Sequence, residues 1–578
     1  MSQQRETANC LPGFGLPLNY NPTKESKGFL GNLFPTALGF ELCGFSLPLT
    51  TLRELSMMHF MNAITDKPDW HIKVHDDIII EKWRAEVSAA GQDFTDKMFG
   101  YCVQELRHKA SFVPAPPAVP PAIIVYDGNV VKSDYAVTAE VKREIQDAMQ
   151  KFEDDIPLRL RDWHPFSDEQ VLDLVHPSLF PLVYGTTRVL EHGTTTLEDF
   201  VQRCGQGKVA SIPSEQETEE SGNTHYSYKW RNPRQVKAYS RKFQWLPCEV
   251  DIAGEGVRIT SYINNLHPDE KDIYRLVEKI IDASIPLWDL TLSPLQAQHP
   301  RFPPRRVLFE GCEYDPDPEN GPETEGPQQL PDEDEEEFWD RRQEWIEATR
   351  QVVRPEPGDF RPRETPSLNI REKYGRTGLQ IIIKFANIVL TPEKPSYGGG
   401  SWHVEGQLRP LYYYSSENIT PSSLNFLIFG CENEEPGVQE IGGVDTREGR
   451  LLTFPNNLQH RVGAFKLADP TKPGHRKILA LFLVDPNIKI ISTAHVPCQR
   501  KDWWKEVALR QESLSENITG LGQLPVELQN HIFDEVEGFP LGMDEAKALR
   551  LELMEERKAY VQVQDATFQQ NTFSLCEH

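Results

Sequence analysis

The sequence has 578 residues, 38% of them hydrophobic and 10% aromatic, which allows a sizeable core and excludes a wholly disordered chain. Its formal net charge is -26. Nucleic-acid binding depends on clustered Lys and Arg, so no nucleic-acid partner is expected.

Nine cysteines are scattered singly without a C-x-x-C pair, which favours reduced thiols in an intracellular protein. The start, MSQQRETANCLPGFG, lacks the basic and apolar regions of a signal peptide. No window approaches the ~18 apolar residues of a membrane span. We therefore expect an intracellular protein, cytoplasmic or nuclear, without a membrane partner.

Helices are predicted to dominate the first 200 residues, and strand-like segments appear near the middle of the chain. Residues 1–30 are rich in Gly, Pro and Asn and indicate a loosely structured N-terminus. Residues 31–92 form a helical module, with helical spacing from Leu52 and a start signal at Asp76-Asp77. Residues 93–310 are expected to mix helices with strands and to belong to the core domain. They include the proline-rich PAPPAVPPA, which favours an extended chain.

An acidic insertion is predicted at residues 311–337. Between Glu313 and Glu337 the chain has twelve Asp or Glu and no Lys or Arg. Such a run favours a solvated, disordered segment, and a basic partner could dock on it.

Residues 338–505 carry most of the predicted strands, in runs such as LQIIIKFANIVL, LNFLIFG and KILALFLV. Short strands separated by Gly, Pro and acidic turns are typical of a sandwich or jelly roll. Residues 506–578 return to helix and end in a polar tail. The predicted class is α+β, with a jelly-roll core, a largely helical N-terminal region and C-terminal helices.

A metal site is predicted at His403-Val404-Glu405, which follows a glycine loop after a strong strand. In an extended chain residues i and i+2 face the same side, so the imidazole and carboxylate can bind one ion. His460, after a later strand, would complete a set of two His and one carboxylate. This set suits a non-haem Fe(II) oxygenase, although zinc or another divalent metal is possible.

Two H-x-D sequences, at His75 and His267, have a simpler explanation. Each lies beside a predicted helix start, where Asp is expected to cap the helix.

Arg476 favours a carboxylate-containing cosubstrate. It follows His460 at the head of the strand RKILALFLVDP. A guanidinium pairs with a carboxylate through two hydrogen bonds and stays charged when buried, so Arg476 suits the far carboxylate of 2-oxoglutarate. His475 and Lys477 are weaker candidates for that role.

Several segments together resemble the fungal family named domain of unknown function 4246, over about residues 30–510. They include IIIKFANIVLTPEKPSYGGGSWHVEG, YYYSSENIT, GRLLTFPNNLQHRV and GHRKILALFLVDP. The core of that family is similar to prolyl-hydroxylase-like 2-oxoglutarate oxygenases. The resemblance implies a double-stranded β-helix that binds Fe(II) and 2-oxoglutarate.

The resemblance also implies roles for single residues. His403, Glu405 and His460 would bind the metal, Arg476 would bind 2-oxoglutarate, and Tyr397 could contact the cosubstrate or simply pack. One departure from the family is a shorter segment between HVEG and YYY. The substrate, a small molecule or a protein side chain, is not indicated.

Two alternatives remain open at this point. One is a cupin-like metal enzyme that does not use 2-oxoglutarate, in which Arg476 should be dispensable. The other is an inactive, oxygenase-derived interaction scaffold. The run LPVELQNHIF after Gln523 resembles the opening of an F-box, although a capped amphipathic helix is the favoured explanation.

Overall fold

The computed structural model divides the chain into two compact units. The core unit comprises residues 1–49, 114–303 and 365–578, and the helical unit comprises residues 50–113 and 304–364. The domain boundaries expected from sequence are finer than this division and stay predictions. The residues that the structure describes are 8–20, 34, 50–91, 93–112, 122–126, 129–218, 239–295, 305–308, 311, 313–362, 368–403, 408–429, 438–456, 458–514, 524–536 and 538–570. The PAPPAVPPA segment lies outside them.

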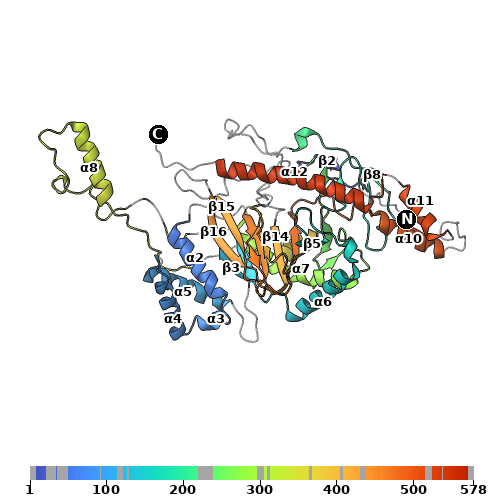
Figure 1. Cartoon of the computed structure of the whole chain (residues 1–578), viewed down its shortest axis with the longest axis horizontal. Coiled ribbons are helices and arrows are strands. Elements are labelled where there is room, and N and C mark those ends of the chain that lie inside the picture. The colour runs from blue at the N-terminus through green and yellow to red at the C-terminus, as the bar shows by residue number, and fades with distance from the viewer. Residues whose placement is uncertain are drawn as a thin grey trace. The chain divides into compact units, whose positions relative to one another are not determined.

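A large antiparallel sheet organises the core unit (Figure 1). Its strands follow the order β11 (Arg258–Ile259), β10 (Cys248–Asp251), β12 (Leu379–Leu390), β20 (Gly474–Leu483), β14 (Leu408–Glu417), β17 (Leu451–Pro455), β4 (Val130–Ser133) and β3 (Ile123–Tyr126), with β5 (Val171–Val175) paired to β12. The ladder between β12 and β20 runs from Ile381↔Leu483 to Leu390↔Gly474. Most residues of β12 are buried on both sides, as its nearly continuous apolar sequence requires.

Two helices cover one face of this sheet (Figure 1), namely α6 (Ala139–Asp155) and α7 (Lys271–Leu292). Apolar residues of α7 such as Ile280 and Trp288 share a buried cluster with Phe385 and Leu481 of the sheet. Each fully buried aliphatic or aromatic side chain of this kind contributes roughly 1.5–3 kcal/mol. This cluster is the main hydrophobic core.

A smaller sheet faces the main sheet from the other side. Its order is β16 (Val438–Asp445), β15 (Ser423–Phe429) and β18 (Gln459–Val462). Phe454 of β17 contacts both Phe426 of β15 and His460 of β18, with ring centroids 5.0 and 4.7 Å apart. A separate short pair consists of β13 (Ser396–Tyr397) and β19 (Phe465–Lys466), and β19 directly follows β18 in sequence.

The remaining elements of the core unit are short strand pairs and peripheral helices. The pairs are β1 (Leu11–Pro12) with β2 (Gly15–Leu16), β6 (Leu182–Val183) with β9 (Phe243–Gln244), and β7 (Arg188–Val189) with β8 (Lys208–Val209). The helices are α9 (Ile370–Tyr374), α10 (Lys501–Leu514), α11 (Val526–Asp534) and α12 (Met543–Gln570). None of the helices in the described ranges is long and apolar enough to cross a membrane.

The helices predicted between residues 52 and 113 are present in the helical unit. They are α2 (Leu52–Thr65), α3 (Trp70–Lys73), α4 (Asp77–Ala89) and α5 (Asp96–Ser111), and the later α8 (Glu335–Thr349) belongs to the same unit. Asp76 caps α4 as expected, accepting from the backbone N–H groups of Ile78 and Ile79. The prediction that Asp269 caps the next helix is wrong. Glu270 is the residue directly before α7, and the backbone N–H of Asp269 donates to His267 Nδ1.

A buried ion-pair network joins three segments of the helical unit. The guanidinium of Arg306 binds both carboxylate oxygens of Glu105, at 2.8 and 2.9 Å, and reaches Glu54 Oε1 at 3.3 Å. All three side chains are almost fully buried. Removing one charge of such a network leaves the others desolvated and unpaired.

We therefore predict that Arg306→Ala destabilises the helical unit by roughly 3–5 kcal/mol. Hydrogen exchange of α2 and α5 measures this loss. Arg354→Ala is the control, because Arg354 pairs with Asp93 while its side chain is 66% exposed. An equal loss of protection in both variants would contradict a special role for the buried network.

Candidate functional site

Two of the predicted metal ligands lie side by side in the core unit. His403 and His460 form an antiparallel bridge, with His403 N–H donating to His460 O at 3.1 Å and the reverse bond at 3.0 Å. Their imidazole centroids are 4.4 Å apart. His460 is buried, and His403 is partly buried. Backbone pairing thus brings together two histidines that are far apart in sequence.

Both imidazoles have a backbone carbonyl next to Nδ1. His403 Nδ1 lies 2.8 Å from Ser401 O, and His460 Nδ1 lies 3.5 Å from Leu458 O. A carbonyl oxygen only accepts, so Nδ1 of His403 carries the hydrogen and its Nε2 keeps the lone pair, whereas a contact of 3.5 Å is too long to fix the tautomer of His460. The tautomer of His403 is the one in which a histidine binds a metal through Nε2. The third predicted ligand, Glu405, lies outside the described residues.

Arg476 lies in β20 opposite Ile388 of β12, with only 1% of its surface exposed. Its guanidinium stacks on the ring of Phe465 at 4.1 Å and donates a long hydrogen bond of 3.4 Å to Ser422 Oγ. Ser422 Oγ in turn donates to Gly463 O, three residues after His460. The arginine therefore faces the same segment that carries the second histidine.

Arg476 differs from the other buried arginines in having no acidic partner among the residues that the structure describes. Arg306 binds Glu105, Arg450 binds Asp134 and Arg550 binds Asp162, each through two nitrogen–oxygen contacts. Within the described ranges, no carboxylate pairs with Arg476, and its Nε lacks a hydrogen-bond acceptor. A buried unpaired charge is costly, so this guanidinium suits an anionic ligand.

Tyr397 lies beside the same arginine. Its ring packs against Phe465 with centroids 5.3 Å apart. Burial raises the pKa of Tyr397, and the nearby charge of Arg476 opposes that rise. Burial also lowers the pKa of Arg476 below its ordinary value, and a guanidinium remains charged at neutral pH even when buried.

The two weaker candidates on β20 have partners elsewhere. His475 Nε2 forms a 2.8 Å hydrogen bond with Ser415 Oγ. Lys477 is buried and pairs with Glu153 of α6 at 2.9 Å. Of the three neighbours 475–477, only Arg476 is turned toward the histidine segment.

A second histidine group, missed from the sequence, has donor atoms close enough to hold a metal ion. His164 Nδ1 lies 2.7 Å from Asp173 Oδ2, and His176 Nε2 lies 4.0 Å from the same oxygen. Asp173 is fully buried, and its other oxygen has no hydrogen-bond partner. The sequence carried no signal for this group, because Asp173 lies in β5 while His164 and His176 lie in the chain before and after that strand, and no regular spacing relates them.

The hydrogen bonds of the second group oppose metal binding. His176 Nδ1 accepts the N–H of Ser178 at 3.1 Å, so its hydrogen sits on Nε2, the atom that faces Asp173. Arg550 Nη1 lies 3.7 Å from Asp173 Oδ2 and adds positive charge. Burial alone would raise the pKa of Asp173, but charge and hydrogen bonding from His176 and His164 lower it below its ordinary value. The group thus satisfies a buried carboxylate with protein donors.

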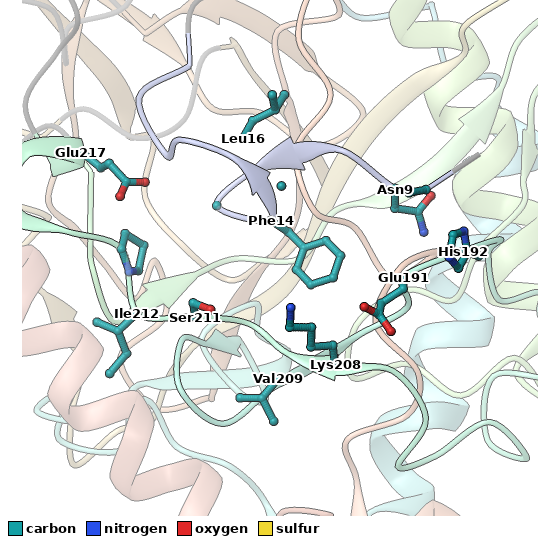
Figure 2. A pocket seen from close by; sticks show the side chains of 14 residues that line it. Asn9, Phe14, Leu16, Glu191, His192, Lys208, Val209, Ser211, Ile212 and Glu217 are labelled. Atoms are coloured by element: carbon teal, nitrogen blue, oxygen red, sulfur yellow. The ribbon is translucent and has the colours of Figure 1, made fainter. Parts of the chain in front are cut away.

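A pocket of about 370 Å³ lies elsewhere in the core unit, lined by fourteen residues that come from the ranges 8–16 and 191–217. Figure 2 shows Phe14 and Lys208 pointing toward one another across it, with Glu191 and His192 at one side. None of the predicted site residues lines it.

Comparison with known families identifies the chain. The family described as "Protein of unknown function (DUF4246)" matches residues 96–427 and 427–507, and "Domain of unknown function DUF4246, N-terminal" matches residues 11–86. The chain belongs to this family, as the sequence resemblance predicted. None of the curated proteins matches it.

Solved structures give only remote likenesses. IDO from Bacillus thuringiensis is 15% identical over 19% of this chain and 46% of its own, with a TM-score of 0.15. The Fe(II)/(alpha)ketoglutarate-dependent dioxygenase TqaL is 17% identical over 23% and 51%, with a TM-score of 0.15. Vicilin from Corylus avellana is 13% identical over 23% and 37%, with a TM-score of 0.13. The chain spans about half of these structures or less, and TM-scores this low carry no argument.

The second histidine group generates a pH prediction. The pKa of His176 lies well below its ordinary 6.5. Burial is the main cause, and the positive charge of Lys384 is the second. Below pH 6.5 the unfolded chain binds a proton that the folded chain excludes, so stability falls as the pH falls. The loss is about 1.4 kcal/mol per pH unit for one such group.

We predict that His176→Asn removes this part of the pH dependence between pH 6.5 and 5. The Asn side chain can still accept the Ser178 N–H in a local turn, yet it does not titrate. Urea unfolding across this pH range makes the measurement. His75→Asn, at an exposed position, is the matched control, and an identical flattening by both substitutions would refute the assignment.

Proposed function

We propose that this chain is an Fe(II)- and 2-oxoglutarate-dependent oxygenase of hydroxylase type, whose substrate is unidentified. The observation that carries the proposal is the buried Arg476 guanidinium, which has no carboxylate partner in the described chain and faces the segment of His460. A dicarboxylate cosubstrate supplies the missing negative charge. It also explains why the charge lies next to two paired histidines.

The strand order supports a jelly-roll, or double-stranded β-helix, core for this enzyme. From β12 onward, eight extended segments follow in sequence: β12, the chain from β13 to His403, β14, β15, β16, β17, the chain from β18 to β19, and β20. The first, eighth, third and sixth lie adjacent in the main sheet. The second meets the seventh through the His403–His460 bridge, and the fourth and fifth continue that sheet. Two such interleaved sets of four are the pattern of a jelly roll.

The histidines fit a metal in this proposal. The carbonyl-bound Nδ1 of His403 fixes the tautomer in which its Nε2 can bind iron, the ring of His460 lies 4.4 Å away, and Glu405 follows His403 by two residues. When bound, Fe(II) with two imidazoles and one carboxylate keeps three open positions for a keto acid and dioxygen, and it supplies the oxidising chemistry.

The chain's own residues bind and orient the cosubstrate. Arg476 would hold the far carboxylate through two hydrogen bonds, while Phe465 fixes the plane of the guanidinium by stacking. Tyr397, a protonated phenol beside Arg476, would donate a further hydrogen bond or exclude water by packing. Burial of this corner keeps water from competing for the charge.

We expect Arg476→Gln to weaken 2-oxoglutarate binding by roughly 10- to 100-fold, because charged hydrogen bonds are lost. Anaerobic protein with Fe(II) is titrated with 2-oxoglutarate, and the visible metal-to-ligand band reports the affinity. Arg258→Gln is the control, since Arg258 lies in the same sheet but its side chain is 73% exposed. A band that survives Arg476→Gln unchanged would favour a cupin-like enzyme that does not use this cosubstrate.

The metal ligands are tested separately by iron stoichiometry. His460→Ala and Glu405→Ala should each abolish tight Fe(II) binding, whereas Asp173→Asn should leave it intact. The opposite pattern would assign the metal to His164, Asp173 and His176. Failure of the wild-type protein to bind any metal would favour the inactive scaffold, with which the shortened segment after Glu405 is also consistent.

A further inference from the structure

The acidic segment of the helical unit folds back on itself to make an arm, residues 313–353. At its base Tyr314 bridges to Val352, and the Asp315 N–H donates to Gln351 O at 2.9 Å. The Val353 N–H donates to Glu313 O at 2.8 Å, and Arg350 stacks on Tyr314 at 5.0 Å. The arm therefore has contacts of its own, although the sequence predicted a disordered insertion there.

Helix α8 is fixed within the arm. Asp334 caps it by accepting the Glu337 N–H at 2.9 Å. Glu333 accepts the N–H of Leu330 and both Nε and Nη2 of Arg341. Gly326 approaches Trp345 so closely that an added Cβ would lie 3.0 Å from the indole. In Figure 1, α8 lies beside the chain that precedes it.

One face of α8 carries an exposed indole beside two carboxylates that form no ion pair with any described residue. Trp339 is 57% exposed and touches only Phe338 among rings, with centroids 5.4 Å apart. Glu335 and Glu336 precede it by four and three residues, so they lie on the same side of the helix. In the described part of the chain, neither forms an ion pair, and both are exposed.

We propose that this face of the arm binds a Lys- or Arg-rich segment of another protein. Trp is the best ring for a cation, and carboxylates one turn away supply the charge for neighbouring cations. A chain of net charge -26 repels its own copies, which makes a second copy a poor occupant. The inference does not depend on the oxygenase activity.

The test measures binding of a short fluorescein-labelled peptide that alternates Lys with Ser to the full chain, by anisotropy at physiological salt. Trp339→Ala should weaken binding by about tenfold, and Trp339→Phe should restore part of it. The double change Glu335→Gln with Glu336→Gln should also weaken binding about tenfold. Circular dichroism checks that the helix content of each variant is unchanged.

The matched control is Glu313→Gln with Glu319→Gln, which removes the same charge from the same acidic run but far from Trp339 in sequence. It should change the affinity by less than about twofold. Equal losses in the two double variants would mean unspecific attraction to an acidic chain and would overturn the proposal. Unchanged peptide binding by the Trp339→Ala variant would also overturn the proposal. The same holds if sedimentation shows that the wild-type chain self-associates and that Trp339→Ala makes it monomeric.

Discussion

The ladder between β12 and β20 is the interaction on which the core unit depends. It pairs ten residues on each side and joins segments almost a hundred positions apart in the sequence. Through β12 it attaches β5 and β10, and through β20 it attaches β14 and the rest of the main sheet. Its register opposes Arg476 to Ile388 and so decides which way the arginine points.

The presence or absence of an acidic partner distinguishes the structural buried arginines from the candidate ligand-binding arginine. Arg450 and Arg550 each hold one aspartate in a two-point contact, and Arg306 holds a glutamate in the same way. These pairs compensate the cost of burial within the protein. Arg476 is equally buried, but its contacts among the described residues are a long one to a hydroxyl and two to aromatic rings. The compensating charge for Arg476 is therefore expected from a ligand.

The hydrogen bonds at Nδ1 distinguish the two histidine groups. His403 donates from Nδ1 to a carbonyl oxygen at 2.8 Å, which leaves its Nε2 able to bind a metal. His176 accepts a backbone N–H at Nδ1, which puts its hydrogen toward Asp173. Proximity of His and Asp side chains favours the second group as a metal site, whereas the hydrogen-bond pattern favours the first.

The sequence by itself determined the helices and strands whose patterns are local. The helices from α2 to α5, the cap at Asp76 and the apolar run of β12 follow from spacing and residue type. Family membership also followed from short motifs. Tertiary structure alone decided the second histidine group, the acid partners of the buried arginines and the folded contacts of the acidic arm, because each joins residues that local periodicity does not relate. The sequence supplied His403, His460 and Arg476 as candidates. Strand pairing decided that the two histidines lie side by side and that the arginine is turned toward the segment that follows His460.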